Sequence, residues 1–423
     1  MSSQENDTPL QQDSPYSIAE VSAFDPVARV DPHPRLRELR EQCPVMYDQT
    51  GKTWFLTRYE DVRRSLQDKT IARHPVLAEE GSFVASFATP DVERDDSETR
   101  LDSILFLNDP DHTRIRTPFA KVFYPRIKKM QSVIEQVVAD VVAAAPDAGS
   151  FDLVQEIALP LPIIVIAKII GVDDSRLKDF REWSEAGIHS LDPLRTPEQT
   201  QIMIEGSQNL HAYFLDLMKT RKAAPRDDLT SDLMLAQAHG ADMNDEEIAT
   251  NLQLLLAAGN LTTTDLIGSG VWLFLTNRDQ LQKLKDDPSL AESAVEEVLR
   301  MESPAAVTAR VIMDERQMDG CPMSANQGML ASLHGANRDP DAFENPDTFD
   351  IARKGPPHVA FGGGQHLCLG APLARLETRH LFKALFEKYP DLHLAEGDDA
   401  VEWRSLPLFR GTEKLMVATG SPE

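Results

Sequence analysis

The chain has 423 residues, of which 43 are Lys or Arg and 68 are Asp or Glu, so its formal net charge is −25. This acidity argues against a nucleic-acid-binding protein, which presents a basic surface. Hydrophobic residues make up 41% of the chain and charged residues 26%, the usage of a globular protein with a large core, which excludes wholesale disorder. The three cysteines, Cys43, Cys321 and Cys368, are scattered and odd in number, a pattern that fits a reducing cytoplasm better than a disulfide framework.

The first 24 residues are polar and acidic and lack the basic and apolar regions of a targeting signal, so we expect a flexible tail there. No linker divides the remainder, and residues 25–423 are expected to form a single domain. The longest apolar run, 159–172, contains two prolines and a lysine and is shorter than the roughly 20 residues of a membrane helix. We therefore expect a buried helix there, and no membrane partner.

Helical patterns dominate the chain. Strand patterns occupy short apolar and β-branched runs at 53–57, 307–313 and 415–418. A proline-free apolar pattern runs from Asp245 to about Asn277, and Asn244 with Glu247 three residues later forms a capping box at its start. At about 1.5 Å per residue this helix would span about 50 Å and cross the whole domain. The predicted fold class is mainly α with small β-sheets.

Three glycines, Gly259, Gly268 and Gly270, lie inside this long helix, although glycine costs about 1 kcal/mol relative to alanine there. Either a neighbouring element packs tightly against the helix, or something close to the helix needs the space. Threonines at 262–264 follow Gly259, and their hydroxyl groups can bond to carbonyls of the preceding turn and bend a helix. We therefore expect a local distortion near Thr262.

From 340 to 357 the chain is rich in proline, which is typical of an ordered loop. The chain then reaches Cys368, which three glycines at 362–364 precede and a helical pattern follows. A cysteine at a helix N-terminus receives backbone N–H groups and the positive end of the helix dipole, which favour the thiolate. From the residues alone, Cys368 is a catalytic thiol, a haem-iron ligand or an inert buried cysteine.

The segment around Cys368 resembles the haem-binding loop of the cytochrome P450 superfamily, whose pattern is F-G-x-G-x-H-x-C-x-G. The matching residues are Phe361, Gly362, Gly364, His366, Cys368 and Gly370. Further matches follow the family's chain order: a C-helix motif at 109–116 (DPDHTRIR), an E-x-x-R motif at Glu297 and Arg300, and the meander arginine Arg353. The resemblance covers 25–418 and has the style of soluble bacterial members without a membrane anchor.

The resemblance implies the cytochrome P450 fold with haem b between the long I helix and the cysteine-bearing L helix, and the Cys368 thiolate as axial iron ligand. It implies that Phe361, Gly362 and Gly370 shape the haem loop. It assigns the haem propionates to His112, Arg116, Arg310, His358 and His366, and it makes Glu297, Arg300 and Arg353 a structural triad. Thiolate ligation favours O–O cleavage, so the implied activity is that of a monooxygenase that inserts one atom of O₂ into its substrate.

The segment 258–263 is similar to the family's oxygen-binding pattern A-G-x-(D/E)-T-T, but it departs from that pattern at the acid. Ala258, Gly259, Thr262 and Thr263 match, and Leu261 occupies the acid position. In the family the acid and the threonine supply protons through water, and leucine transfers none. Three interpretations stay open. Thr262 orients water while Asn260 or Asp265 supports an altered relay; the enzyme uses peroxide, which brings protons and electrons; or the position is tolerated with poorly coupled turnover.

The segments that match the family's substrate-facing regions are small or apolar and contain no obvious charged anchor. They are Phe83, Val84 and Phe87; Leu254, Leu255 and Ala258; Ala305, Ala306 and Val307; and Leu406, Pro407 and Leu408. Such walls suit a hydrophobic substrate, and the adjacent alanines suggest room for a terpenoid, steroid, macrolide or polycyclic aromatic. The alternative is that large neighbouring residues fill that space.

Two groups of basic residues stand out in this acidic chain, and the resemblance puts both near the cysteine side of the haem. They are Arg114, Arg116, Lys121, Arg126, Lys128 and Lys129, and Arg375, Arg379 and Lys383. They suit an acidic ferredoxin that an NAD(P)H-dependent reductase supplies with electrons, with a plain solvated face as the alternative. The main hypothesis is a ferredoxin-driven monooxygenase. The alternatives are a peroxide-driven peroxygenase and a haem sensor without turnover, against which Thr262 and the apolar pocket argue.

Overall fold

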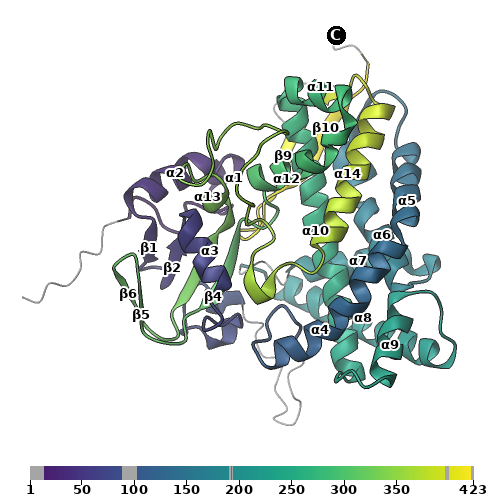
Figure 1. Cartoon of the computed structure of the whole chain (residues 1–423), viewed down its shortest axis with the longest axis horizontal. Helices are drawn as coiled ribbons and strands as arrows, with labels where there is room; N and C mark the ends of the chain where they lie inside the picture. Colours follow the sequence, from purple (N-terminus) through teal and green to yellow (C-terminus); the bar gives the residue numbers. More distant parts are fainter. Residues whose placement is uncertain (1–13, 88–101, 190–191, 193, 396–399, 421–423) are drawn as a thin grey trace, which may run out of the picture.

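The chain folds into a helix-rich part and a part built around small sheets. The computed structural model describes residues 14–87, 102–189, 192, 194–395 and 400–420. Figure 1 shows α10 and α14 running side by side in the helix-rich part, with strands β1, β2 and β4 to β6 and the N-terminal helices gathered beside it. The architecture is mainly α with small sheets, as the sequence predicts.

Helices carry most of the described chain. They are α1 Pro26–Val30, α2 His33–Gln42, α3 Tyr59–Gln67, α4 Asp111–Lys129, α5 Gln131–Ala144, α6 Pro160–Ile170, α7 Leu177–Ile188, α8 Pro197–Ala223, α9 Leu229–Ala238, α10 Asp245–Thr276, α11 Arg278–Asp286, α12 Ala291–Met301, α13 Leu333–Asn337 and α14 Ala371–Lys388. Short helical turns flank the site described below: η2 Ala85–Phe87 and η7 Gly364–His366.

The strands are short. They are β1 Val45–Asp48, β2 Thr53–Leu56, β3 Ser150–Asp152, β4 Val307–Val311, β5 Arg316–Met318, β6 Cys321–Met323, β7 Gly328–Ser332, β8 His393–Leu394, β9 Val401–Trp403 and β10 Thr412–Ala418. One sheet has the order β1-β2-β7-β4, in which only β2 and β7 are parallel. A second has the order β3-β10-β8, with β9 also paired to β10, and β5 and β6 form a hairpin. The three predicted strands correspond to β2, β4 and the end of β10.

The long predicted helix is α10, and it crosses the core. The side chain of Asn244 accepts a hydrogen bond from the Glu247 N–H, and the Glu247 carboxylate accepts one from the Asn244 N–H, each at 2.8 Å, which is the predicted capping box. The helix packs against α6, α8, α12 and α14. Thr262 makes the expected bond to the Ala258 carbonyl, at 2.8 Å, but α10 remains α-helical from end to end, so the expected distortion is absent.

The three helix glycines serve two different purposes. A Cβ at Gly270 would lie 3.1 Å from Cε1 of Phe382 and 3.2 Å from Cγ1 of Val298, so α12 and α14 pack tightly there. A Cβ at Gly268 would overlap the hydroxyl group of Thr412 in β10. By contrast, apart from the adjoining backbone of α10, no atom of the described residues lies within 4 Å of the position that a Cβ at Gly259 would take. Tight packing therefore explains Gly268 and Gly270, and open space borders Gly259.

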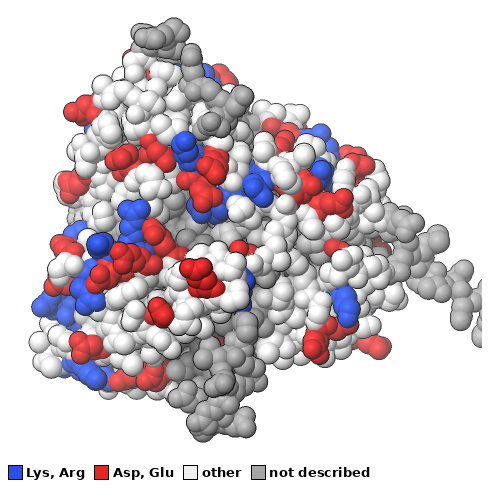
Figure 2. Space-filling model, turned by 180° about the vertical axis from the view of Figure 1, so that it is seen from behind, with Lys and Arg blue, Asp and Glu red and all other residues white. Residues whose placement is uncertain are grey.

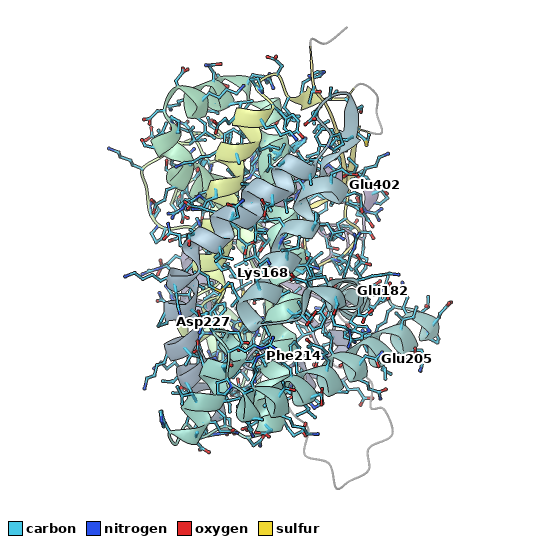
Figure 3. All side chains as sticks on the ribbon, turned by 90° about the vertical axis from the view of Figure 1, so that its right-hand side faces the viewer. Lys168, Glu182, Glu205, Phe214, Asp227 and Glu402 are labelled. Carbon is cyan, nitrogen blue, oxygen red and sulfur yellow. The ribbon has the colours of Figure 1, made fainter. Side chains whose placement is uncertain are left out.

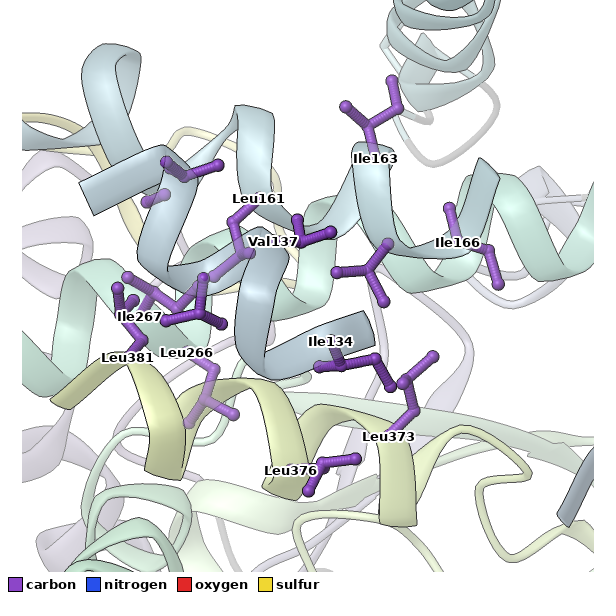
Figure 4. Close-up of a cluster of buried hydrophobic side chains, with 14 of the residues drawn as sticks. Ile134, Val137, Leu161, Ile163, Ile166, Leu266, Ile267, Leu373, Leu376 and Leu381 are labelled. Carbon is purple, nitrogen blue, oxygen red and sulfur yellow. The ribbon is translucent and has the colours of Figure 1, made fainter. Parts of the chain in front are cut away.

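The apolar run at 159–172 forms the buried helix α6, as predicted. Figure 4 shows side chains of α5, α6, α10 and α14 meeting in one apolar cluster, among them Val137, Leu161, Leu266 and Leu381. This cluster fixes α14, and with it the cysteine loop, against the long helix. Among the described helices none is both long and apolar enough to cross a membrane.

The surface is charged and mixed. Figure 3 shows Phe214 of α8 inside the helix-rich part, where it is fully buried, while the labelled acidic residues Glu182, Glu205 and Glu402 lie at the periphery. On the face seen in Figure 2, basic and acidic side chains alternate and do not gather into one basic patch. This arrangement fits the acidic composition of the chain.

Part of the predicted N-terminal tail is packed. Residues 1–13 lie outside the described residues. From residue 14 onward the chain lies against the first sheet, where Ile18 is 2% and Val21 5% exposed, and the Ile18 N–H donates to the Asp48 carboxylate. The expectation of a loose tail is therefore wrong for 14–24, because these two apolar residues in a polar segment are enough to anchor it.

Candidate functional site around Cys368

Cys368 lies between η7 and the first turn of α14. Its backbone N–H donates to the Phe361 carbonyl at 3.0 Å, which closes the loop. Burial raises the pKa of its thiol, while the N–H groups of Gly370 and Ala371 and the guanidinium groups of Arg116 and Arg375 act in the opposite direction. The side chain is nevertheless accessible. The thiol is thus desolvated by the surrounding protein while its surface remains open to a binding partner.

The glycines before Cys368 are required by the backbone. Gly362 has φ +71° and Gly364 has φ +61°, left-handed values that other residues rarely adopt. A Cβ at Gly364 would collide with the Leu66 carbonyl oxygen at the end of α3, so the loop also lies directly on this helix. Phe361 is covered by the guanidinium group of Arg375, 4.6 Å from the ring centre. The loop is therefore rigidly shaped around the thiol.

Two histidines from distant segments stack beside this loop. The rings of His112, in the first turn of α4, and His366, in η7, lie 4.2 Å apart. Neither ring nitrogen of His112 nor Nε2 of His366 has a hydrogen-bond partner within the described part of the chain, although all three are buried. Burial, and then the charges of Arg73, His112, Arg310 and Arg116 in that order, lower the pKa of His366 to about 2. These three arginines and two histidines thus form one cluster, which we call the cation cluster after its arginines.

Two arginines of the cation cluster, Arg73 and Arg310, lie together, because Nη1 of each donates to the Thr308 hydroxyl and to the Ala309 carbonyl. Burial and the charge of Arg73 lower the pKa of Arg310 well below its usual range, and burial lowers the pKa of Arg73 to about 10. No carboxylate of the described residues forms an ion pair with either arginine. Sequence reasoning missed Arg73, because it belongs to no motif and only the fold brings the loop after α3 against β4.

Of the other predicted propionate partners, Arg116 contacts the cysteine loop, whereas His358 lies elsewhere. Arg116 donates from Nη2 to the Leu367 carbonyl, so it touches the cysteine loop directly. His358 lies outside the cation cluster, with Nε2 3.2 Å from the Glu296 carboxylate. Burial acts to raise the pKa of Glu296, but His358 and Arg375 outweigh it and hold this pKa at about 2. The structure brings His112, Arg116, Arg310 and His366 together, and it directs His358 toward Glu296.

The residues present fit a haem. Buried cations without anions are costly unless a counter-charge is supplied, and the two propionates of haem would supply it. Ala258 is exposed in the middle of α10, where most side chains are buried, and the space next to Gly259 is open. An accessible thiol, open space along α10 and unpaired cations are the three features that a flat group with an iron centre and two carboxylates needs.

The predicted oxygen-binding segment lies in the middle of α10. Leu261 is 5% exposed and Thr263 is 4% exposed, so neither side chain borders open space, whereas Thr262 is only half-buried. Nδ2 of Asn260 donates to Ser184 of α7 at 3.1 Å, and its Oδ1 has no partner within the described part of the chain.

Asp265, one turn beyond Leu261, is fully buried. Its Oδ1 accepts hydrogen bonds from Arg404 at 3.1 and 3.2 Å, while Oδ2 has no hydrogen-bond partner within the described chain. Burial raises the pKa of this carboxyl to about 6, against the opposing charge of Arg404. Asp265 is therefore the carboxyl group of the central part of α10 that titrates near neutral pH.

The predicted structural triad forms a buried network. Arg300 donates to both oxygens of Glu297 at 2.8 and 2.9 Å, and Nε of Arg353 donates to the same carboxylate at 3.0 and 3.1 Å. The two arginines also bond to backbone carbonyls of Pro346 and Thr348. The network ties α12 to the proline-rich loop at 340–357, which leads into the cysteine loop.

The predicted pocket residues divide into three groups. Phe83, Ala306 and Val307 line one pocket together with Pro407 and Leu408, but N-terminal residues such as Ile18 and Leu36 form its other side, and no residue of α10 or of the cysteine loop lines it. Phe87 stacks edge-on against Phe83, and the backbone of Ala305 pairs with Phe409 beside the same segment. Leu254 is partly buried on α10 near Ala258, while Leu255 and Leu406 are each 8% exposed. The predicted substrate-facing role of Val84 is corrected: its side chain is 0% exposed because it packs on Gly328, so it presents no surface to a substrate.

Comparisons with known proteins agree with this geometry. The family model described as "Cytochrome P450" matches residues 37–402. Cytochrome P450 107B1 of Saccharopolyspora erythraea is 36% identical over 96% of this chain and 99% of its own. The 6-deoxyerythronolide B hydroxylase of the same organism is 33% identical over 92% of this chain and 96% of its own. The solved structure of myxobacterial CYP267B1 in complex with myristic acid superimposes with a TM-score of 0.84 at 32% identity, covering 94% of this chain and 99% of that one.

Proposed function

This chain belongs to the cytochrome P450 family, and we propose that it is a ferredoxin-driven monooxygenase that hydroxylates or epoxidises a hydrophobic small molecule. Family membership makes it an oxidoreductase with haem held by a cysteine thiolate. The observation that carries the proposal is the accessible Cys368 thiol at the start of α14, together with Arg73 and Arg310, which form no ion pair with a carboxylate of the described residues. We take the haem to be haem b and Cys368 to be its ligand.

Each part of the site has a defined task in this proposal. When bound, the haem supplies O₂ activation and oxygen insertion. Cys368 provides the thiolate, which the N–H groups of Gly370 and Ala371 stabilise against burial. The cation cluster holds the two haem carboxylates through charge-assisted hydrogen bonds. The apolar walls near Ala306 and Val307 keep water away from the reacting carbon.

We propose that protons reach the site through an altered relay on α10. Leu261 carries no proton, but Thr262 and Asp265 are three residues apart and therefore lie on the same face of the helix. The carboxyl of Asp265, with a pKa of about 6, gains and loses a proton just below neutral pH, and its Oδ2 has no hydrogen-bond partner in the described chain. The hydroxyl of Thr262 then positions the last water, while its own proton is engaged with the Ala258 carbonyl.

A second candidate function follows from Leu261. Its buried, apolar side chain stands where the family has an acid, and hydrogen peroxide would bring both the protons and the electrons. In a peroxygenase, substrate and peroxide give product without a reductase. In a monooxygenase, product requires O₂ and reduced ferredoxin. Turnover of one substrate under these two conditions separates the two functions.

We propose that an acidic ferredoxin docks at the groove between α4, α12 and α14, which Lys128, Arg375 and Arg379 line together with Glu292 and Glu296. Four of the nine predicted basic residues already have acidic partners: Arg114 with Glu247, Arg126 with Asp232, Lys129 with Asp227, and Arg375 with Glu296. For Lys128 and Arg379 the described residues offer no ion pair. Electron transfer should therefore slow with added salt, and a salt-independent rate would contradict this docking site.

The experiment that tests the proposed function is a spin-state titration of the purified ferric protein, followed by turnover. The panel contains terpenoids, steroids, macrolides, aromatics and fatty acids, because a macrolactone hydroxylase and a fatty-acid complex are among the similar proteins. A saturable shift identifies a substrate class. Turnover of that substrate under ¹⁸O₂ should put one labelled atom into the product, and unlabelled product would contradict a monooxygenase.

A further inference from the structure

Arg73 is held in place by backbone groups from two segments. Its Nε donates to the Leu105 carbonyl at 3.2 Å, and its Nη1 donates to the Ala309 carbonyl at 2.8 Å and to the Thr308 hydroxyl. Its own N–H donates to Asn108 at 2.9 Å. These bonds fix the guanidinium group between β4 and the segment before α4. Nη2 makes no hydrogen bond to any described residue, so one edge of the group is left for another partner.

The absence of a counter-charge sets this pair of arginines apart. Every other buried arginine of the described chain pairs with a carboxylate: Arg40 with Asp339, Arg126 with Asp232, Arg221 with Asp228, Arg300 with Glu297, and Arg410 with Glu302. Arg310, at 4% exposed, has no such partner among the described residues, and the half-buried Arg73 beside it has none either. Burying two like charges together is unfavourable unless an anion binds between or beside them.

We propose that Arg73 is a carboxylate-binding residue that, together with Arg310, completes a buried site for one carboxylate group. The inference rests on the proposed function, because a haem propionate or a carboxylate of the substrate has to supply the anion. Arg73 has neighbours on the haem side and on the substrate side, so the structure is consistent with either source. Among charged groups, Arg73 acts most strongly on His366 of the cation cluster. It also bonds to Thr308 and Ala309, which directly follow the pocket residue Val307 on β4.

The test compares the holoenzyme with its Arg73→Gln and Arg73→Lys variants, and with Arg58→Gln as a matched control. Arg58 is an exposed arginine that pairs with Asp319. The first measurement is the rate of haem transfer from each protein to excess apomyoglobin. The second is the ratio of the dissociation constants for dodecanoic acid and dodecan-1-ol, taken from spin-state titrations, because these two ligands differ mainly in the carboxylate.

If a haem propionate is the partner, Arg73→Gln accelerates haem transfer by about ten-fold or more and leaves the acid-to-alcohol ratio unchanged. If the substrate is the source, haem transfer is unchanged and the acid loses about ten-fold in affinity relative to the alcohol. Arg73→Lys keeps the charge, so the quantity that changes in Arg73→Gln should change less in Arg73→Lys. This variant also supplies the comparison if Arg73→Gln does not fold. Arg58→Gln should change neither quantity.

Two results would overturn the inference. One is that both quantities stay within about two-fold of wild type in Arg73→Gln. The other is that Arg73→Lys loses as much as Arg73→Gln while acid and alcohol weaken equally, which would indicate a purely structural arginine. In both cases a holoenzyme with the thiolate-type spectrum leaves the proposed function intact. A chain that retains no haem contradicts the proposed function as well.

Discussion

Two buried charge clusters of this molecule are built on opposite principles. Around Glu302, one carboxylate satisfies His33, Arg338 and Arg410 at distances of 2.5 to 3.0 Å. In the cation cluster, Arg73, Arg310, His112, His366 and Arg116 gather, and neither the buried Arg310 nor the half-buried Arg73 pairs with a carboxylate of the described chain. A cluster that is complete in itself holds the fold together. A cluster that lacks its anion marks the place where a ligand has to bind.

The largest effect is expected from breaking the complete cluster with Glu302→Gln. Burial alone would raise the pKa of Glu302, but Arg410, His33 and Arg338 hold it well below its usual range. Losing the carboxylate leaves the buried Arg410 without a counter-charge and leaves Arg338 with only Asp347, at 3.3 Å, so the free energy of unfolding should fall by about 3–5 kcal/mol. Denaturant titration at pH 7 measures it. The matched control Glu79→Gln, at an exposed pair with Lys52, should change by less than about 0.5 kcal/mol, and equal effects would contradict the account.

The next effect concerns pH and Asp265. Its folded pKa of about 6 lies above the ordinary 3.8, so the folded state binds this proton more tightly than the unfolded state. The stability contributed by the carboxyl is therefore present below about pH 4 and is lost as pH rises to about 6, by roughly 2–3 kcal/mol. Asp265→Asn removes this dependence. Denaturant titrations at several pH values give the free energy of unfolding of both proteins as a function of pH. The two plots should differ in slope between about pH 4 and pH 6, and parallel plots would rule out the raised pKa.

A contrasting effect is expected from Arg310→Met in the incomplete cluster. Removing one of two unpaired buried charges should leave the haem-free chain as stable as before or more stable. The holoenzyme should nevertheless lose haem to apomyoglobin about ten-fold faster, because a propionate partner is gone. In Arg310→Met, haem retention is therefore expected to fall although the stability of the haem-free chain does not. In Glu302→Gln, stability is expected to fall first. A large loss of stability in haem-free Arg310→Met would place this arginine in the same class as Arg410.

The smallest effect tests the proton relay. Leu261→Asp restores the acid that the family pattern has before Thr262, so the fraction of electrons that end in product should rise, by about two-fold or more. The measurement is product formed per NAD(P)H consumed with a substrate that gives a full spin shift. Leu261→Asn has a similar size without the acid and serves as the control. Unchanged or lower coupling in Leu261→Asp would indicate that Asp265 already suffices or that peroxide is the oxidant.

Much of this architecture could be predicted because it depends on local signals. The capping box, the helical periodicity and the glycine-rich cysteine loop located α10, α14 and Cys368 from the sequence. Arg73 could not be predicted, because its role depends on the loop after α3 meeting β4 and no local pattern records that contact. The same holds for Glu296, which takes His358 away from the cation cluster, and for Val84, whose neighbour Gly328 lies on another strand.

The most direct test of the account is whether the chain recognises the carboxylates of its cofactor. The wild-type chain is reconstituted with hemin and, separately, with hemin dimethyl ester, in which both propionates are capped, and haem retention is measured by transfer to apomyoglobin. The account predicts that both complexes show the thiolate-type spectrum of the reduced carbon monoxide adduct and that the ester leaves at least about ten-fold faster. Equal rates of loss would contradict the claim that the cation cluster is a carboxylate site.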